Sequence, residues 1–201
     1  MDYKPENNLS DRYLIEKVLN GNTAAFSTII KNTERLVAQI VFKMIPNIED
    51  RKDIAQDIYL KTFHKLGSFK FQSKLSTWIG QIAYNTCLSY LEKKKLVFLK
   101  YNFDNESQDE ALEFISSKIN MENETEKQLF RKELSEILTI EIEKLQPIYQ
   151  VLINLYHNEE LSYTEISQIT QLPEGTVKNY LFRARKKLKE NLFLTHKKEE
   201  L

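Results

Sequence analysis

Apolar residues recur at helical spacing along the first half of the chain. Between residues 22 and 45 they follow an i, i+3, i+4, i+7 pattern, which predicts one long helix with a single apolar stripe. A shorter helix, with apolar positions at Ile15 and Val18, precedes it and is expected to stop at Asn20-Gly21. The dipeptide Pro46-Asn47 is expected to end the long helix.

Two further helices complete this first unit. One is expected from about residue 49 to residue 66, followed by a break at Gly67-Ser68 and a loop over residues 69–74. The next is expected from about residue 76 to residue 95, with Trp78 among its core positions. Four helices with short connections can close a bundle of roughly 85 residues. We therefore assign residues 10–95 to a first helical domain.

The second half of the chain begins differently. Residues 96–124 are rich in Asn, Asp, Glu and Ser and have no sustained period, which indicates a flexible acidic linker. A second helical domain is expected over residues 125–193, where Pro147 stands at a helix start and two helices follow in quick succession. The predicted fold class is all-α: two small helical domains joined by a flexible acidic linker, the C-terminal one a helix-turn-helix.

Composition supports helices and removes several classes of function. The 201 residues include only 4 Gly and 4 Pro, too few turn residues for an all-β sandwich. A single Cys excludes an internal disulfide and a multi-thiolate zinc site, and the 3 His are far apart, so neither a metal nor a cofactor is expected. No apolar run reaches the roughly 18 residues of a membrane span, and residues 1–10 are polar. We expect a cytoplasmic protein without membrane insertion.

The formal net charge of +0 conceals three charged blocks. Residues 61–100 carry eight basic side chains and one acidic, residues 101–143 carry four basic and twelve acidic, and residues 173–201 carry eight basic and four acidic. Local blocks, rather than the total, decide whether a polyanion is attracted. A solvated helix face explains any single run, but two basic blocks on separate helical units favour nucleic-acid binding.

The segment from residue 161 to residue 188 has the pattern of a helix-turn-helix. Ser162 and Glu165 form a capping box for a short helix, and Pro173 stands where the next helix can begin. Val177 and Leu181 mark the side of that second helix that is expected to face a core. The remaining positions face mostly outward: Lys178, Asn179, Phe182, Arg183, Arg185, Lys186 and Lys189. Such a helix suits a major groove; the alternative is a hairpin of two core helices with a solvated basic face.

A second group of residues combines an acidic helix face with a basic, aromatic loop. The helix from Asp50 to Lys61 is acidic and polar on its exposed side, and lysines alternate with aromatic residues in the loop and helix that follow. Aromatic rings beside lysines suit single-stranded DNA, because bases stack while ammonium groups hold the backbone. Trp78 is at core spacing, so Phe69 and Phe71 are the rings expected to be exposed.

Three segments carry a resemblance to a known family. Residues 50–63, DRKDIAQDIYLKTF, resemble a polymerase-binding helix, and residues 76–95, STWIGQIAYNTCLSYLEKKK, resemble a promoter-melting helix. Residues 161–188, LSYTEISQITQLPEGTVKNYLFRARKKL, resemble an upstream-element reader. The chain thus resembles an extracytoplasmic-function (ECF) sigma factor, a small two-domain initiation factor of bacterial RNA polymerase.

The resemblance implies a role for each group of residues. Contacts to the clamp helices of the largest polymerase subunit are implied for Asp50, Asp53, Gln56, Asp57 and Lys61. Contacts to the minus-ten element, including capture of a flipped base by the loop, are implied for Phe69, Lys70, Phe71, Lys74, Asn85, Lys93 and Lys94. Contacts to the minus-thirty-five element are implied for Thr176, Lys178, Asn179, Phe182, Arg183 and Lys186.

The resemblance also implies partners. Core RNA polymerase would be bound through its largest and second-largest subunits, the latter by its flap, and promoter DNA would be bound by both domains. Sigma factors of this type are often restrained by an anti-sigma factor, and they work in the cytoplasm at the nucleoid. Gln171 departs from the family at a turn position that is usually Gly, where a left-handed conformation costs about 1 kcal/mol.

Three other functions fit parts of the pattern. A stand-alone helix-turn-helix repressor or activator would share the C-terminal segment, but no long heptad seam for a dimer is present. A helical enzyme lacks support because the sequence has neither paired Glu-x-x-His motifs nor a Gly-rich phosphate loop. A helical adaptor would use the basic helix only as a solvated face. The sequence therefore favours a sigma factor that is not an enzyme.

Overall fold

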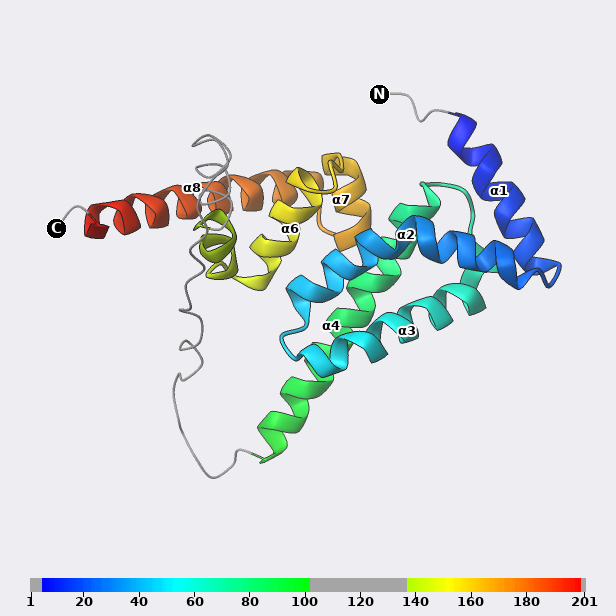
Figure 1. The fold of residues 1–201 in the computed structure, drawn as a ribbon, viewed down its shortest axis with the longest axis horizontal. Helices are drawn as coiled ribbons and strands as arrows, with labels where there is room; N and C mark the ends of the chain where they lie inside the picture. The colour runs from blue at the N-terminus through cyan, green and yellow to red at the C-terminus, as the bar shows by residue number, and fades with distance from the viewer. Residues whose placement is uncertain (1–4, 102–136, 200–201) are drawn as a thin grey trace, which may run out of the picture.

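The computed structural model describes residues 5–101 and 137–199, and every regular element in these two ranges is a helix. The first range holds α1 (Pro5–Leu19), α2 (Thr23–Met44), α3 (Ile48–Lys65), the single 3₁₀ turn η1 (Leu66–Ser68) and α4 (Leu75–Tyr101). The second holds a helical segment over 137–143, then α6 (Pro147–His157), α7 (Tyr163–Thr170) and α8 (Glu174–Glu199) (Figure 1). The predicted all-α class is confirmed.

Local chemistry explains where the helices begin and end. The side chain of Asn22 accepts a hydrogen bond from the Ala25 N–H at 3.1 Å, and Asn47 accepts one from the Glu49 N–H at 3.0 Å, so both asparagines cap helices. Gly21 follows α1 with a φ of 88°, a conformation that glycine adopts without a steric cost. The breaks expected at Asn20-Gly21 and Pro46-Asn47 lie between helices as predicted.

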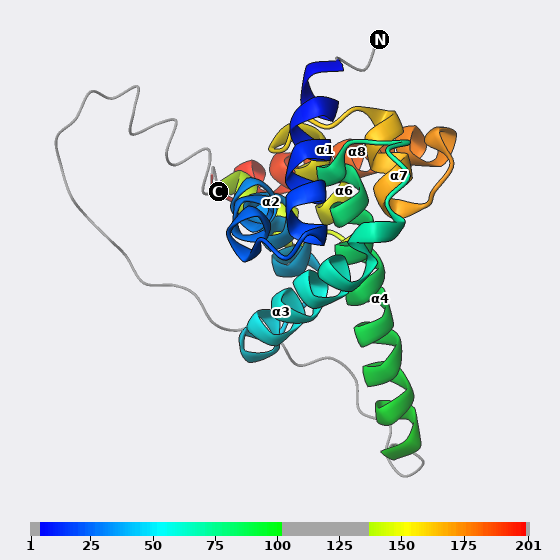
Figure 2. The ribbon, with the colours of Figure 1, turned by 90° about the vertical axis from the view of Figure 1, so that its right-hand side faces the viewer.

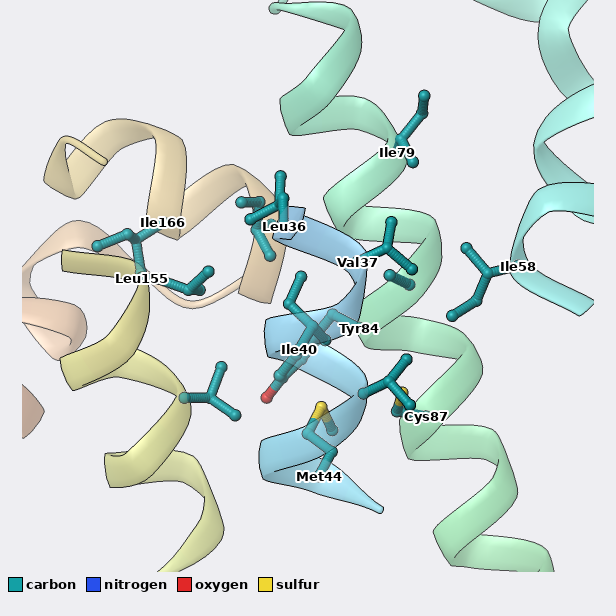
Figure 3. Packing of buried hydrophobic residues seen from close by; sticks show 14 of the residues in the cluster. Leu36, Val37, Ile40, Met44, Ile58, Ile79, Tyr84, Cys87, Leu155 and Ile166 are labelled. Carbon is teal, nitrogen blue, oxygen red and sulfur yellow. The ribbon is translucent and has the colours of Figure 1, made fainter. Parts of the chain in front are cut away.

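Helix α2 lies at the centre of the described structure. It contacts α1, α3 and α4, which belong to the first unit, and also α6, which belongs to the second. Its apolar stripe is buried along its whole length: Ala25, Ile29, Leu36, Val37, Ile40, Val41 and Met44. Figure 3 shows the α2 residues between α4 on one side and Leu155 and Ile166 on the other. A single apolar core therefore extends through both units.

Direct contact between the two units was not predicted from the sequence. Helix α7 packs on α4, and α6 packs on α2, so residues separated by about half the chain are neighbours. Polar groups join the units as well, because the Asn154 amide donates a hydrogen bond to Gln39 at 2.6 Å. The two helical units are thus docked on each other through both apolar and polar contacts.

The fourth helix is longer than the sequence pattern indicated. The predicted helix ends near residue 95, whereas α4 continues to Tyr101, into the segment assigned to the linker. Its last turns project beyond the other helices (Figure 2). The remainder of the predicted linker, and residues 125–136 of the predicted second domain, lie outside the described residues.

Burial controls the chemistry of Cys87. This α4 residue is 0% exposed in the core, and burial raises the pKa of its thiol to about 12, with the Lys61 cation opposing the rise only partly. A thiol with such a pKa has almost no reactive thiolate at neutral pH. We expect Ellman's reagent at pH 8 to leave the folded protein unmodified and to label one thiol after denaturation. A Ser89→Cys variant, exposed on the same helix, should react at once; equally fast labelling of folded wild-type protein would contradict the assignment.

Candidate polymerase and nucleic-acid interfaces

The exposed side of α3 carries an acidic and polar face. Ile54, Ile58 and Thr62 are buried, which turns Asp53, Gln56 and Asp57 toward solvent. Lys61 lies 2.9 Å from the Asp57 carboxylate, a surface ion pair at i, i+4 spacing that adds at most about 1 kcal/mol. These four residues of the predicted polymerase-binding set therefore share one accessible face.

Asp50, the fifth member of that set, is held by α4 instead. Its carboxylate accepts a short hydrogen bond from the Tyr90 hydroxyl and lies 3.0 Å from the Lys94 ammonium. The bond from Tyr90, and then the one from Lys94, lower the pKa of Asp50. Hydrogen bonds of Lys94 with Tyr90 and then with Asp50 raise the pKa of Lys94. The structure thus joins Asp50, which is predicted to bind polymerase, to Lys94, which is predicted to bind the minus-ten element.

Two large apolar side chains on α3 were not singled out in the sequence. Leu60 is 57% exposed and Phe63 is 44% exposed, and Phe63 meets Phe26 edge-on with ring centroids 5.1 Å apart. Both residues lie outside the stripe of residues that α3 buries. Their positions in the helical pattern could therefore have identified them as exposed apolar side chains. They give the acidic helix an apolar component, which is typical of protein interfaces.

The loop between η1 and α4 is built around aromatic rings. Phe69, expected to be exposed, is only 8% exposed, because its ring packs 4.9 Å from Phe71 and 5.1 Å from Trp78. Phe71 is half-buried, has a positive φ of 57° and lies under the Arg12 guanidinium at 4.7 Å. The expectation of two exposed rings was therefore wrong for Phe69, whose ring supports the loop from within.

A polar pocket of about 300 Å³ opens beside this loop. Thr77 in its wall is 2% exposed, and its hydroxyl has no hydrogen-bond partner among the described residues. Such a buried polar atom favours a ligand that completes its hydrogen bonding. The pocket is lined by Ser68, Phe69, Lys70, Gln72, Ser73, Thr77, Trp78, Gln81 and Gln168. The last of these belongs to α7, so the second unit forms part of the wall.

The other residues predicted to bind the minus-ten element are spread along α4. Asn85 is half-buried, and Lys93 and Lys94 are exposed. At about 1.5 Å of rise per residue, Asn85 lies about 15 Å from the start of α4 and Lys93 about 27 Å. These residues share a helix with the pocket wall but do not line the pocket. Lys74 lies in the loop and pairs with Glu165 of α7 at 2.7 Å.

The C-terminal helices form the predicted helix-turn-helix. Ser162 and Glu165 make the capping box of α7 with both reciprocal hydrogen bonds, as the sequence predicted. Gln171 takes the left-handed conformation expected of the turn, with a φ of 59°. The Ser167 hydroxyl donates to the Leu172 carbonyl at 2.6 Å and closes the turn. These contacts fix the angle at which α8 leaves the turn.

Helix α8 buries one face and exposes a cationic one. Val177, Leu181 and Ala184 are buried in the core. Thr176 is half-buried, and the rest of the predicted minus-thirty-five set is exposed: Lys178, Asn179, Phe182, Arg183 and Lys186. Phe182 is 67% exposed, which is unusual for a phenylalanine and places an apolar group among these polar side chains. The arrangement fits a recognition helix.

A stacked tyrosine pair flanks this helix and was missed in the sequence. The rings of Tyr156 and Tyr163 stack with centroids 5.1 Å apart. The Arg185 guanidinium lies 5.0 Å from the Tyr156 ring, and the Lys178 ammonium lies 5.4 Å from the Tyr163 ring. Burial and the nearby Arg185 cation lower the pKa of His157, which accepts a hydrogen bond from Arg185 at 3.4 Å. The tyrosines therefore orient two cations at the edge of α8.

Two absences apply to residues 5–101 and 137–199. No group of three or more His, Cys, Asp or Glu side chains in these ranges could hold a metal ion. Within the same ranges, no helix is both long enough and apolar enough to span a membrane.

Comparison with known protein families identifies both units. Residues 29–97 match sigma-70 region 2, and residues 135–188 match sigma-70 region 4. The fold is similar to that of CnrH in a complex with the cytosolic domain of CnrY, with a TM-score of 0.59 at 20% identity over 92% of this chain and 98% of that one. It is also similar to RpoE in a complex with the anti-sigma factor NepR from Bartonella quintana, with a TM-score of 0.60 at 21% identity over 83% of this chain and 96% of that one.

Curated relatives define the group within the sigma-70 class. The chain is 31% identical over 179 residues to the ECF RNA polymerase sigma factor SigW of Bacillus subtilis strain 168, covering 89% of this chain and 94% of SigW. It is also 31% identical over 182 residues to the ECF RNA polymerase sigma-E factor of Escherichia coli strain K12, covering 88% of this chain and 91% of the relative. The chain belongs to the ECF RNA polymerase sigma factors.

The link between Asp50 and α4 generates a pH-dependent prediction. A carboxylate whose pKa is lowered by folding stabilises the protein above its unfolded pKa and loses that contribution as pH falls through the folded pKa. We expect Tyr90→Phe to lower the thermal unfolding midpoint at pH 7, and the difference from wild type to shrink at pH 3. Circular dichroism at both pH values measures it. Tyr13→Phe, at an exposed tyrosine, is the control; a difference that does not depend on pH would contradict the role of Tyr90.

Proposed function

We propose that this chain is an ECF-type sigma factor that directs core RNA polymerase to specific promoters and assists DNA opening at initiation. The observation that carries the proposal is that one chain combines three features: a capped helix-turn-helix with an exposed cationic helix, an acidic helix face, and a polar, aromatic pocket. Sigma factors act in transcription initiation without being enzymes, and we propose the same for this chain. Its site of action is the cytoplasm, at the nucleoid.

The first role is attachment to core polymerase through α3. Asp53, Gln56 and Asp57 present acidic and amide groups to the clamp helices of the largest subunit. The exposed Leu60 and Phe63 add apolar contact area on the same helix. Asp50 contributes to the surface from its link with Tyr90 and Lys94. Charge complementarity then sets the orientation and the rate of association.

The second role is capture of the minus-ten element. A flipped base enters the pocket beside the loop, where Trp78 offers an aromatic surface. The Thr77 hydroxyl, which has no partner in the described part of the chain, offers the base a hydrogen bond. Lys70 and Lys74 hold the backbone near the pocket, and Asn85, Lys93 and Lys94 follow the strand along α4. Phe71 supports the loop through its contact with Phe69. Stacking on such a platform contributes about 1–3 kcal/mol per base.

The third role is recognition of the minus-thirty-five element by α8. The exposed residues Lys178, Asn179, Phe182, Arg183 and Lys186 face the major groove, and the half-buried Thr176 contacts the DNA near the start of the helix. Arg185, oriented by Tyr156, adds a cation at the edge of the helix for a phosphate. The same unit binds the flap of the second-largest polymerase subunit. Two weak DNA contacts in one holoenzyme reinforce each other through their high effective concentration.

An anti-sigma factor is a further proposed partner. CnrH is described in a complex with the cytosolic domain of CnrY, and RpoE from Bartonella quintana in a complex with the anti-sigma factor NepR. The similarity of fold supports a partner of this class for the present chain.

A stand-alone regulator, the alternative function, would leave the region 2 match and the acidic face of α3 without a role.

Core binding tests the proposed function directly. We expect purified protein to bind bacterial core polymerase at sub-micromolar concentration and to start transcription at discrete sites on genomic fragments. The double variant Asp53→Asn, Asp57→Asn should bind core at least tenfold more weakly, because it removes two exposed carboxylates of α3 and leaves the buried residues of this helix unchanged. Glu16→Gln, at an exposed carboxylate on α1, is the matched control. Wild-type protein that binds duplex DNA tightly but not core polymerase would instead indicate the stand-alone regulator.

Arg183 tests recognition of the upstream element. Bidentate contact of a guanidinium with a guanine contributes about 1–3 kcal/mol of discrimination. We therefore expect Arg183→Ala to weaken holoenzyme binding by that amount on a mapped promoter, measured by footprinting and gel shift. Lys187→Ala removes one exposed charge from the same helix and should weaken intact and scrambled upstream elements equally. An unchanged upstream footprint for Arg183→Ala would remove Arg183 from the reading face.

A further inference from the structure

Helix α1 contacts the segment between η1 and α4 through two neighbouring residues. The Asp11 carboxylate accepts a hydrogen bond from the Leu75 N–H at 3.3 Å. The Arg12 guanidinium lies 4.7 Å from the centroid of the Phe71 ring. Figure 1 shows this segment passing beside α1 before α4 begins. Because Asp11 and Leu75 are 64 positions apart, the spacing of neighbouring residues does not indicate the contact.

The position of α1 is itself fixed by the core. Ile15 and Val18, about one and two helical turns beyond Asp11, are 4% and 5% exposed and belong to the apolar core. Helix α1 also packs on α2 and on η1. The carboxylate of Asp11 and the guanidinium of Arg12 are therefore presented to the loop from an anchored helix.

Asp11 supplies a cap that α4 lacks in its own sequence. The Lys74 carbonyl accepts the first hydrogen bond of the helix, from the Trp78 N–H at 3.1 Å, so Lys74 stands at the N-cap position. A lysine side chain has no acceptor for the free N–H groups of a first turn, and its charge opposes the helix dipole. The Asp11 carboxylate provides an acceptor and a negative charge from α1 instead. Burial raises the pKa of Asp11, and the hydrogen bond from Leu75 opposes the rise only in part, so this carboxylate is kept here against a desolvation cost.

Arg12 begins a continuous row of contacting groups that ends in the pocket wall. Its guanidinium covers Phe71, the Phe71 ring centroid lies 4.9 Å from that of Phe69, and Phe69 lies 5.1 Å from Trp78. Phe71 has a positive φ of 57°, which is unfavourable for a residue with a Cβ atom, so contacts with neighbours have to hold it there. Phe69 and Trp78 both line the pocket. A change at Arg12 is therefore expected to reach the pocket through two rings.

We propose that Asp11 and Arg12 are positioning residues for the pocket of the flipped base: Asp11 fixes the start of α4, and Arg12 fixes Phe71 and the rings behind it. The inference rests on the proposed function, because it explains how that pocket keeps its shape before DNA arrives. A wall that is already ordered does not have to be ordered on binding, so more of the stacking free energy is left for opening the duplex.

Fluorescence of Trp78, the chain's single tryptophan, tests whether α1 holds the pocket wall in the full-length protein. We expect acrylamide to quench Trp78 at least twofold more efficiently in Arg12→Gln and in Asp11→Ala than in wild type. Asp11→Asn keeps a carbonyl acceptor for the Leu75 N–H and should restore the wild-type value.

Lys17→Gln is the matched control for the loss of a cation from α1. The Lys17 ammonium lies 4.4 Å from the ring of Tyr13, which is exposed on the same helix, and covers no loop residue. This variant should quench as wild type does. Equal quenching in wild type, Arg12→Gln and Asp11→Ala would overturn the positioning role, and a change in only one of the two variants would remove the other residue from it.

Promoter opening by the holoenzyme provides the second measurement. On a promoter mapped with wild-type protein, Arg12→Gln should leave the closed complex unchanged in a gel shift and slow opening at least threefold by permanganate footprinting. A residue needed only for stability would lower both, because both depend on the fraction of folded protein. If Arg12 acts through Phe71, Arg12→Gln should cause no further loss in a Phe71→Leu background.

The remaining outcomes each decide one step. A further loss from Arg12→Gln in the Phe71→Leu background would make Arg12 a direct phosphate contact and overturn its action through the ring. Stronger quenching of Trp78 with unchanged opening would overturn the importance of the ordered wall for DNA. If wild-type holoenzyme opens no promoter, the proposed function fails, and the quenching of Trp78 still decides whether α1 holds the wall.

Discussion

The burial of α2 from two sides is the constraint on which the structure depends. Its apolar residues pack against α3 and α4 on one side and against α6 on the other, so the same helix completes two cores. Fully burying a side chain such as Ile40 or Val37 contributes about 1.5–3 kcal/mol. The positions of α4 and α7, and therefore of the loop between η1 and α4, follow from how these helices cover α2 and one another.

Acidic and basic side chains are concentrated in separate regions of the folded chain. The acidic groups of α3 and the cations of α8 lie on different parts of the molecule, as the positions of the two helices in Figure 1 illustrate. A neutral chain can thus offer an anionic surface to a protein partner and a cationic one to DNA. Two ion pairs instead join separate segments: Asp50 with Lys94 links α3 to α4, and Lys74 with Glu165 links the loop before α4 to α7.

Much of the local structure could be predicted from the sequence, because it depends on residues close together in the chain. The capping box at Ser162 and the helix start at Pro147 are each set within a few residues, and both are confirmed. The outward face of α8 follows from the spacing of Val177 and Leu181 in the same way.

Contacts between distant segments could not be predicted in this way. Periodicity indicates that one face of a helix is apolar, but it does not identify what covers that face, so the docking of α7 on α4 was missed. Phe69 appeared to be a free loop residue because Trp78 and Phe71, which enclose it, meet it only in the folded chain. The hydrogen bond from Tyr90 to Asp50 joins residues 40 positions apart, so the spacing of neighbouring residues could not predict it.

The burial of the chain's single cysteine limits how oxidants and electrophiles can act on this protein. Oxidants and electrophiles act on thiolates that they can approach, and Cys87 offers neither a thiolate nor access. A change in cellular redox state therefore has no sulfhydryl of the folded protein to modify. A thiol-based signal that alters the activity of this protein must be sensed by another molecule and passed on through binding.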